Sequence, residues 1–266
     1  MRVSQSVIAS LGPIKQQLTC RFREANAYLS NYTRSSGPPD TVRVVIFAQG
    51  RTGSTFLESL LCSSGYFRQN GELLSTRYGE VKFPISFISG LSKRTQGNFI
   101  FHVKLPHLTK DRANPVDPNS FLQTLYADGW KIIYLRRENK VKHALSNIVA
   151  KHRGNYHKLD TAVEDFKILF KCEQLTKRVN RRTAYEEQEK EALVNVEFHE
   201  VIYEKDLEST QSHQQTADRI FEYLSLPPKA VTTQYKKVNS RPLEELMSNY
   251  DEFVDCLHQH GLQTFL

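Results

Sequence analysis

Four short apolar runs alternate with longer segments of mixed polarity along the chain. The runs cover residues 42–47, 98–105, 130–136 and 196–203. The first run is almost wholly apolar and the other three are taken to share its character, which is the pattern of a strand buried on both faces of a parallel sheet. A helical pattern follows each run after a turn or loop. Strands that alternate with helices predict an α/β fold, in which a central parallel sheet is flanked by helices.

Before the first run, residues 14–32 carry apolar side chains at helical spacing and predict an amphipathic helix. The segment "SSGPPD" at 35–40 ends that helix. We therefore expect an N-terminal helical extension over residues 1–40 and a single α/β domain over residues 41–266. A packing role for the extension is favoured over that of a lid on an acceptor site.

The segment 161–193 predicts one long helix or two. Its expected core face consists of Val163, Phe166, Phe170 and Leu175. Its charges change from basic at residues 177–182 to acidic at residues 186–191. A solvated helical surface is the favoured interpretation of this charge run.

The composition is that of an ordinary globular protein, with 39% hydrophobic and 24% charged residues. The formal net charge of +7 fits a protein that handles anions. Nucleic acid, acidic lipid and phosphorylated or sulfated small molecules all qualify as partners. A solvated basic surface without any partner is the alternative.

The four cysteines are scattered and form no CxxC pair, which argues against a zinc site and against a disulfide framework. No apolar segment reaches the ~18 residues that a transmembrane helix requires. The first residues also contain no apolar run long enough for the core of a secretory signal. A reducing, cytoplasmic setting is the simplest interpretation.

The segment "QGRTGST" at 49–55 follows the first apolar run and begins a helical pattern. The first N–H groups of a helix lack intrahelical partners, and the helix dipole adds positive charge there, so such a turn suits an anion. Unlike the Walker loop of kinases, it has no lysine before its hydroxyl residues. This favours a smaller anion handled without metal, although the glycines could serve only the geometry of the turn. The candidate anion-binding residues are Gly50, Arg51, Thr52, Gly53, Ser54 and Thr55.

A second basic motif follows the third apolar run. The run ends in Arg136 and Arg137, and a helical pattern with Lys140, His143 and Ser146 comes next. Ligands of open α/β sheets bind at the carboxyl ends of strands. These side chains could therefore hold a second phosphate through charge-assisted hydrogen bonds. An exposed basic helix is the alternative.

Together, "GRTGST" and "LRRENKVKHALS" resemble the two donor motifs of sulfotransferases that use 3′-phosphoadenosine 5′-phosphosulfate. The stretches "VIYEKDLEST" and "ADRIFEYLSLPP" agree with that family. Residues 238–257 are similar to the C-terminal segment of bacterial carbohydrate members of the trehalose and nodulation-factor type. The resemblance covers about residues 42–257 and implies a P-loop-like three-layer fold.

The resemblance implies that the first loop holds the 5′-phosphosulfate, while an arginine and Ser146 hold the 3′-phosphate. Many members place that arginine eight residues before the serine. Arg137 and Arg136 stand nine and ten residues before Ser146, so either could be the phosphate ligand. Arg241, in the C-terminal segment, is added to the donor-binding residues.

The resemblance places the catalytic base at Glu72 in the loop "FRQNGELL". The alternative base is His107 in "FHVKLPHL", because sulfotransferases of phenols and steroids carry a Lys-x-His step with histidine as base. The spacing here is one residue longer, and His102 precedes the lysine. Lys104 is expected to place charge near the sulfuryl group. No HExxH or other metal-ligand spacing occurs among the histidines, so no metal is implied.

The preferred hypothesis is a metal-independent sulfotransferase acting on a hydroxyl of a carbohydrate or glycolipid, with adenosine 3′,5′-bisphosphate as the product. A small alcohol or phenol as acceptor, and a divergent P-loop kinase of a small molecule, are alternatives. A basic nucleic-acid-binding module is disfavoured because no nucleic-acid motif is present.

Some bacterial members of that family dimerise, so a homodimer is possible. The loops 75–97 and 153–160 carry no readable code for the acceptor.

Overall fold

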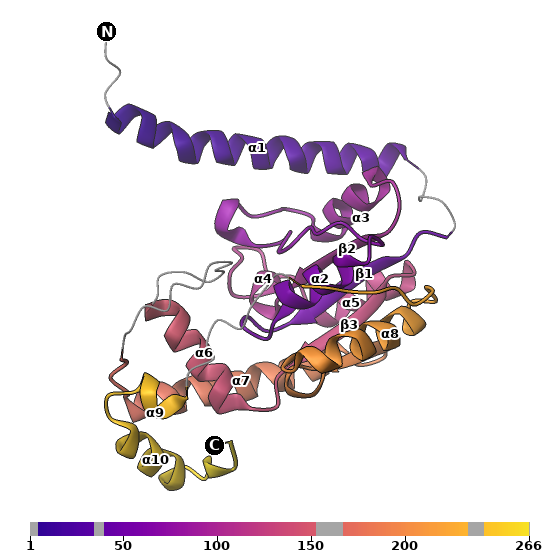
Figure 1. The fold of residues 1–266 in the computed structure, drawn as a ribbon. Helices are drawn as coiled ribbons and strands as arrows, with labels where there is room; N and C mark the ends of the chain where they lie inside the picture. The colour runs from indigo at the N-terminus through magenta and orange to yellow at the C-terminus, as the bar shows by residue number, and fades with distance from the viewer. Residues whose placement is uncertain (1–4, 35–39, 153–166, 234–241, 266) are drawn as a thin grey trace. The chain divides into compact units, whose positions relative to one another are not determined.

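The computed structural model describes residues 5–34, 40–152, 167–233 and 242–265 (Figure 1). The chain forms two compact units. Unit 1 consists of residues 1–48, 65–134 and 192–199, and unit 2 of residues 49–64, 135–191 and 200–266. The expected division at residue 40 into an extension and one domain stays a prediction.

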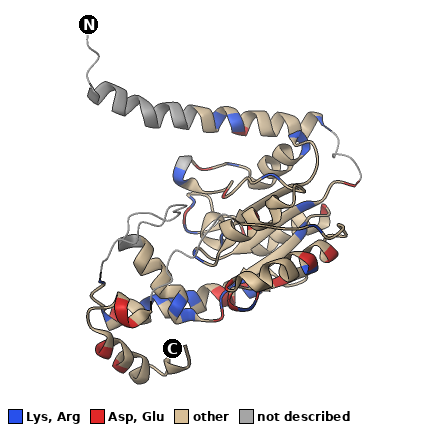
Figure 2. Cartoon of the chain, in the orientation of Figure 1, with Lys and Arg blue, Asp and Glu red and all other residues tan. Residues whose placement is uncertain are grey.

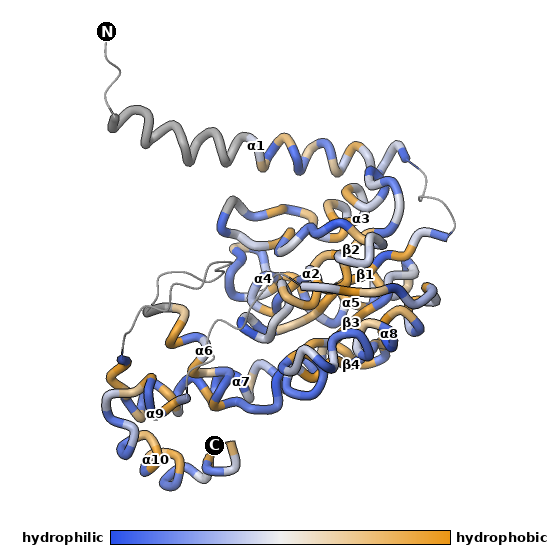
Figure 3. Tube along the Cα trace, viewed as in Figure 1, coloured by the Kyte–Doolittle hydropathy of each residue, from blue (hydrophilic) through white to orange (hydrophobic). Residues whose placement is uncertain are grey.

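A four-stranded parallel sheet flanked by helices confirms the predicted α/β class (Figure 1). Its order is β2-β1-β3-β4. Neighbours β1 and β2 run parallel, with Phe47 opposite Val103. Strands β1, β2 and β3 are almost wholly buried and lie in hydrophobic stretches of the chain, as the apolar runs predicted (Figure 3). The same prediction is wrong for β4, in which Val201 is the one buried residue and Phe198 is exposed. The strands are Arg43–Ala48 (β1), Phe99–Val103 (β2), Lys131–Arg136 (β3) and Phe198–Ile202 (β4).

Unit 1 contains the long N-terminal helix, which extends beyond the predicted residues 14–32. It packs on α3, and Glu24 accepts a hydrogen bond of 2.7 Å from the N–H of Lys82, just before α3. Ala27 is fully buried beside Gly90 of α3. The helices of this unit are Gln5–Thr33 (α1), Pro84–Arg94 (α3), Leu105–Leu108 (α4) and Pro118–Ala127 (α5), with a 3₁₀ turn at Thr76–Tyr78.

Unit 2 has a hydrophobic cluster in which α6, α7 and α10 take part. Val141, Leu175, Phe253 and Leu257 are among its buried members. A π-helical turn at Tyr203–Leu207 follows β4 directly. The helices are Ser54–Ser63 (α2), Lys140–His152 (α6), Cys172–Ala192 (α7), His213–Tyr223 (α8), Leu243–Leu246 (α9) and Tyr250–Gln259 (α10), with 3₁₀ turns at Thr210–Ser212 and Gln263–Phe265.

The charge run of α7 is solvated in part: Lys177, Arg181, Glu187 and Glu191 are exposed, as predicted, and the other side of the helix corrects the interpretation. Figure 2 marks both kinds of charge along this helix. Arg182, Glu186 and Glu189 are buried, because they face partners elsewhere in unit 2. Of the predicted core face, Phe170 and Leu175 are buried, and Val163 and Phe166 lie outside the described residues.

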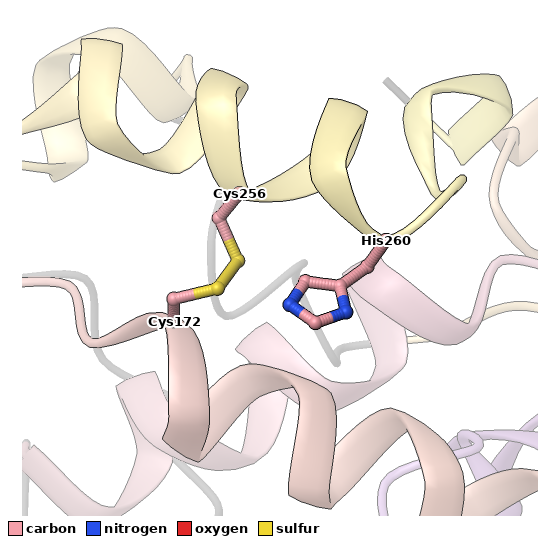
Figure 4. Close-up of side chains that lie close together, drawn as sticks. All are labelled: Cys172, Cys256 and His260. Carbon is pink, nitrogen blue, oxygen red and sulfur yellow. A yellow bond between two sulfur atoms is a disulfide. The ribbon is translucent and has the colours of Figure 1, made fainter.

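A disulfide joins Cys172, the first residue of α7, to Cys256 of α10, with the two Cα atoms 5.7 Å apart (Figure 4). The expectation that the cysteines form no disulfide is therefore wrong. Sequence spacing concealed the pair because 84 residues separate its members. The reducing setting stays a prediction without support from the cysteines. No helix in the described part of the chain is long and apolar enough to cross a membrane.

Gly90 is the point of closest approach between α1 and α3. A Cβ atom built at Gly90 would lie 1.8 Å from the Ala27 carbonyl oxygen. Replacing glycine by alanine inside an open helix stabilises it by up to ~1 kcal/mol. We expect the opposite here, since Gly90→Ala would push α1 away from α3. Hydrogen exchange should show faster exchange of the α1 amides. The control Ser86→Ala, on the same helix, should leave α1 protected, and equal protection in both variants would contradict the prediction.

Candidate functional site

The loop between β1 and α2 contains left-handed backbone conformations that residues other than glycine rarely adopt. Arg51 and Gly53 have positive φ angles of 72° and 100°, and α2 begins at Ser54. A Cβ atom at Gly53 would lie 3.0 Å from the Tyr203 ring. Thr52 is buried and donates a 2.7 Å hydrogen bond to the Gln49 carbonyl. Glycine is therefore required at 53 both by its φ angle and by its neighbour.

Arg137 brings the second basic motif against this loop within unit 2. Its guanidinium lies 4.0 Å from the centroid of the Tyr203 ring. Nε donates to Glu204 Oε1 at 3.3 Å, and Nη1 donates to the Arg51 carbonyl at 3.4 Å. The aromatic face and the carboxylate fix the direction of the guanidinium. The two motifs that were expected to act together thus lie side by side.

Arg136 points to different partners. Its Nε donates to Glu200 Oε1 at 2.7 Å, and its Nη2 lies 3.4 Å from Glu138 Oε1. Both of these glutamates are more than 40% exposed, whereas Arg137 is buried. Of the two arginines left open by the sequence, Arg137 is the one that contacts the loop.

The remaining candidate donor-binding residues differ in burial and position. Ser54 is buried at the start of α2, and Thr55 follows it, partly exposed. Ser146 is partly exposed on α6, in the same unit. Arg241 lies outside the described residues.

Buried polar side chains support the loop from α6 and α7. His143 Nε2 lies 2.9 Å from the Gly50 carbonyl oxygen and, since a carbonyl only accepts, must carry the proton. Gln49 Nε2 donates to the Arg182 carbonyl and to Glu189 Oε2, both at 3.1 Å. Burial first, and then the charge of Arg182, holds the pKa of His143 well below its ordinary value. The imidazole is therefore uncharged at neutral pH.

Further contacts gather around the start of α6. Lys140 donates to the Arg137 carbonyl at 2.6 Å and pairs with Glu186. Burial, followed by the charge of Arg136, lowers the pKa of Lys140 to about 8. The Glu204 carboxylate accepts from the backbone N–H of Glu138 at 2.9 Å. A carboxylate thus occupies N–H groups of the kind that bind anions at helix starts.

Sequence reasoning assigned no role to Tyr203 and Glu204. The only signal was their place in a stretch that resembles a known family. No pattern near Gln49 or His143 predicted their supporting contacts. The partners, Glu189 of α7 for Gln49 and Gly50 for His143, lie more than 90 residues away along the chain.

In unit 1, a second cluster forms where the chain passes the free side of β2. Arg68 pairs with Phe99 as a parallel bridge, and the His102 N–H donates to the Gly71 carbonyl at 3.1 Å. These contacts hold residues 68–72 beside β2 and set Glu72 near Lys104. The sequence placed these residues in separate segments, and the structure brings them together.

The Glu72 carboxylate is surrounded by three basic side chains. It forms an ion pair with Lys104, and the Nε2 atoms of His102 and His107 each lie 3.5 Å from one of its oxygens. Burial alone would raise the pKa of Glu72, but His102 and the Lys104 ammonium outweigh it and hold that pKa well below its usual range. Glu72 is therefore ionised at neutral pH.

His107 is an uncharged partner of this carboxylate. Burial lowers the pKa of His107 to about 4, against the opposing effect of Glu72. The Lys104 N–H donates to His107 Nδ1 at 3.4 Å, so the remaining proton sits on Nε2 and faces Glu72. In this arrangement His107 has no free lone pair with which to accept a proton.

No protein-family model matches the chain, and no curated protein matches it. Among solved structures, the crystal structure of mouse sulfotransferase SULT7A1 complexed with PAP is similar to it, with a TM-score of 0.42 and 11% sequence identity. The similarity covers 85% of this chain and 68% of that chain.

Two buried histidines with lowered pKa, His107 and His143, should make the protein less stable in mild acid. Below pH ~6.5 the unfolded chain binds protons that these folded imidazoles do not, so the free energy of unfolding falls as pH falls. Each contributes a slope of up to ~1.4 kcal/mol per pH unit. His143→Gln keeps an N–H donor for Gly50 without the titration, and should remove about half of that histidine slope. Urea unfolding between pH 5 and 7 measures it; an unchanged slope would contradict this account.

Proposed function

We propose that the protein is a sulfotransferase that moves a sulfuryl group from 3′-phosphoadenosine 5′-phosphosulfate to a hydroxyl of a carbohydrate or glycolipid. One observation carries the proposal: the Arg137 guanidinium lies against the loop at the start of α2, 3.4 Å from the Arg51 carbonyl. Two cationic motifs that meet in one unit suit a ligand with anionic groups at two places. The doubly phosphorylated sulfate donor has that form.

Each part of the donor has a candidate partner in unit 2. The 5′-phosphosulfate would lie on the first N–H groups of α2, with the hydroxyls of Ser54 and Thr55 and the charge of Arg51. The 3′-phosphate would lie on Arg137 and Ser146. Glu204 and the Arg51 carbonyl accept hydrogen bonds from two nitrogens of Arg137. A guanidinium has five N–H donors, so Arg137 has more donors than these contacts require.

The kinase alternative finds less support in the residues of the loop. A P-loop kinase places a lysine before its hydroxyl residue, and Gly53 stands before Ser54 here. Magnesium prefers carboxylate and other oxygen ligands. In the described ranges, the one group of three or more metal-ligand side chains within 4.8 Å of one another holds two cysteines, Cys172 and Cys256. Glu204 is engaged by Arg137 and by backbone N–H groups.

The proposed reaction is an in-line displacement. The acceptor oxygen bonds to sulfur while the bond from sulfur to the phosphate oxygen breaks, and adenosine 3′,5′-bisphosphate leaves with the electron pair. Glu72 takes the proton of the acceptor hydroxyl. Within unit 1, β1 and β2 are parallel neighbours, so their carboxyl ends lie at the same edge of the sheet, and Lys104 follows β2 there.

The contacts of Glu72 favour it over His107 as the base. Both nitrogens of His107 are used, one toward the Lys104 N–H and one toward Glu72, so His107 would orient the carboxylate. Lys104 would turn its charge toward the sulfuryl oxygens when the donor binds. The pKa of Glu72 would then rise, and the carboxylate would become a better proton acceptor.

The proposed function is tested with sulfur-labelled donor and a panel of acceptors that includes trehalose, chitin oligosaccharides and a simple phenol. Labelled product with a sugar, unaffected by EDTA, is expected. Labelled phenol alone would correct the acceptor class. Transfer from ATP that EDTA abolishes would replace the proposal by the kinase alternative.

Neighbouring arginines provide a matched pair of variants for the donor site. Arg137→Ala should weaken the binding of adenosine 3′,5′-bisphosphate by ~10- to 150-fold, because charge-assisted hydrogen bonds of ~1.5–3 kcal/mol are lost. It should leave the affinity for adenosine 5′-phosphate, which lacks the 3′-phosphate, nearly unchanged. Arg136→Ala should alter neither. Calorimetry with both nucleotides measures this, and an equal loss for both in Arg137→Ala would show that Arg137 serves the loop instead.

Glu72→Gln should lower the turnover rate by at least ~100-fold while the affinity for adenosine 3′,5′-bisphosphate stays the same. The amide keeps the size of the side chain and loses the capacity to accept the proton. Glu80→Gln is the control, since this loop glutamate of the same unit accepts a hydrogen bond from the Ala113 N–H instead of meeting Lys104. Full activity of Glu72→Gln would assign the base to another group.

A further inference from the structure

Three metal-ligand side chains of unit 2 meet where α7 begins and α10 ends. Cys172, Cys256 and His260 each offer one ligand atom, and these atoms all lie within 4.8 Å of one another (Figure 4). Cys256 and His260 are four residues apart around the C-terminal turn of α10, so they share one face. Cys172 meets them from α7. The proposed sulfuryl transfer uses none of these residues.

We propose that the reduced form of this cluster binds Zn²⁺ through the thiolates of Cys172 and Cys256 and the imidazole of His260. Two thiolates and an imidazole are a typical zinc donor set, with Zn–S distances of ~2.3 Å and Zn–N distances of ~2.0–2.1 Å. A tetrahedral ion of those dimensions places its ligand atoms ~3.3–3.8 Å apart. The present cluster, with Cα atoms of the two cysteines 5.7 Å apart, reaches that range by rotation of side chains once the sulfurs part.

The exposure of the three side chains suits a metal that enters from solvent. Cys256 is buried, Cys172 is half-buried and His260 is exposed. The metal would thus be anchored on the inner side and open on the outer side, where a water completes four ligands. Soft thiolates select zinc over magnesium or calcium, which require oxygen ligands.

The disulfide and the zinc ion are alternative ways to join the same two helices. A dithiol reductant cleaves the S–S bond, giving two thiols and the oxidised cyclic disulfide of the reductant. Binding of Zn²⁺ then releases two protons from the thiols, while neutral His260 gives a lone pair and no proton. In a reducing compartment, where disulfides rarely persist, zinc would hold α10 to α7. In an oxidising one the disulfide would.

The proposal is tested on the full chain in a Cys20→Ser/Cys62→Ser background, which removes the two free cysteines. The protein is reduced with a dithiol, freed of reductant without oxygen, and titrated with Co²⁺ and then Zn²⁺. We expect one Co²⁺ per chain, with thiolate-to-cobalt charge-transfer absorption that Zn²⁺ abolishes. The oxidised protein should bind none. Native mass spectrometry with Zn²⁺ gives the stoichiometry independently.

Two exposed histidines of the same segment provide the matched variants. Mutation of a residue that only hydrogen-bonds to a metal ligand weakens metal binding by up to ~100-fold. His260→Ala removes a ligand itself and should therefore weaken Zn²⁺ binding by more than ~100-fold. His258→Ala, at an exposed position of α10, should bind as the parent does. The proposal is overturned if the reduced protein binds no metal, if the oxidised protein binds equally, or if His260→Ala and His258→Ala behave alike. None of these results depends on sulfotransferase activity.

Discussion

The structure of unit 2 depends on how buried positive charge is compensated around the loop between β1 and α2. Arg137, Lys140 and Arg182 are all largely buried there, and an unpaired buried charge costs several kcal/mol. Glu204 pairs with Arg137 and Glu186 pairs with Lys140, while Arg182 donates to Gln49 Oε1 at 3.4 Å. The same side chains bond to loop atoms, since Arg137 donates to the Arg51 carbonyl. Charge compensation and loop shape are thus set by the same contacts. Under the proposed function, a loop fixed in this way would need little reorganisation to bind the anionic donor.

The π-helical turn after β4 shows how one short segment serves this constraint. Tyr203 packs its ring on Gly53 and under the Arg137 guanidinium, which sets the distance between the two basic motifs. Glu204 then accepts from Arg137 and from the backbone where α6 starts. The carboxylate binds donors of the kind that a phosphate uses, and these contacts hold the Arg137 guanidinium in place. A phosphate at the same arginine would share these donors with Glu204 or displace it.

Local patterns in the sequence predicted the parts of this arrangement that depend on neighbouring residues. The four strands, the helix start after Gly53 and the loop with Glu72 follow from apolar runs and turn chemistry. Long-range pairing decided the rest. Arg136 and Arg137 are chemically identical, and distant partners such as Glu200 for Arg136 and Glu204 for Arg137 distinguish them. The charged face of α7 gave the pattern of a solvated helix, because partners such as Gln49 lie more than 130 residues away. The disulfide was missed for the same reason.

In unit 1, the proposed base Glu72 forms an ion pair with Lys104, which affects how well it can accept a proton. A carboxylate whose pKa lies far below neutrality is ionised, yet it accepts a proton weakly. The hydrogen bond from His102 and then the Lys104 ammonium lower the pKa of Glu72 and produce both conditions there. A group that binds the Lys104 ammonium and moves it away from Glu72 removes an attraction that stabilises the ionised carboxylate. The proton affinity of Glu72 then rises by the free energy of that attraction. Sulfuryl oxygens would be such a group. Under the proposed function, Glu72 would become a competent base only when the donor is in place, and Lys104 would connect the two events.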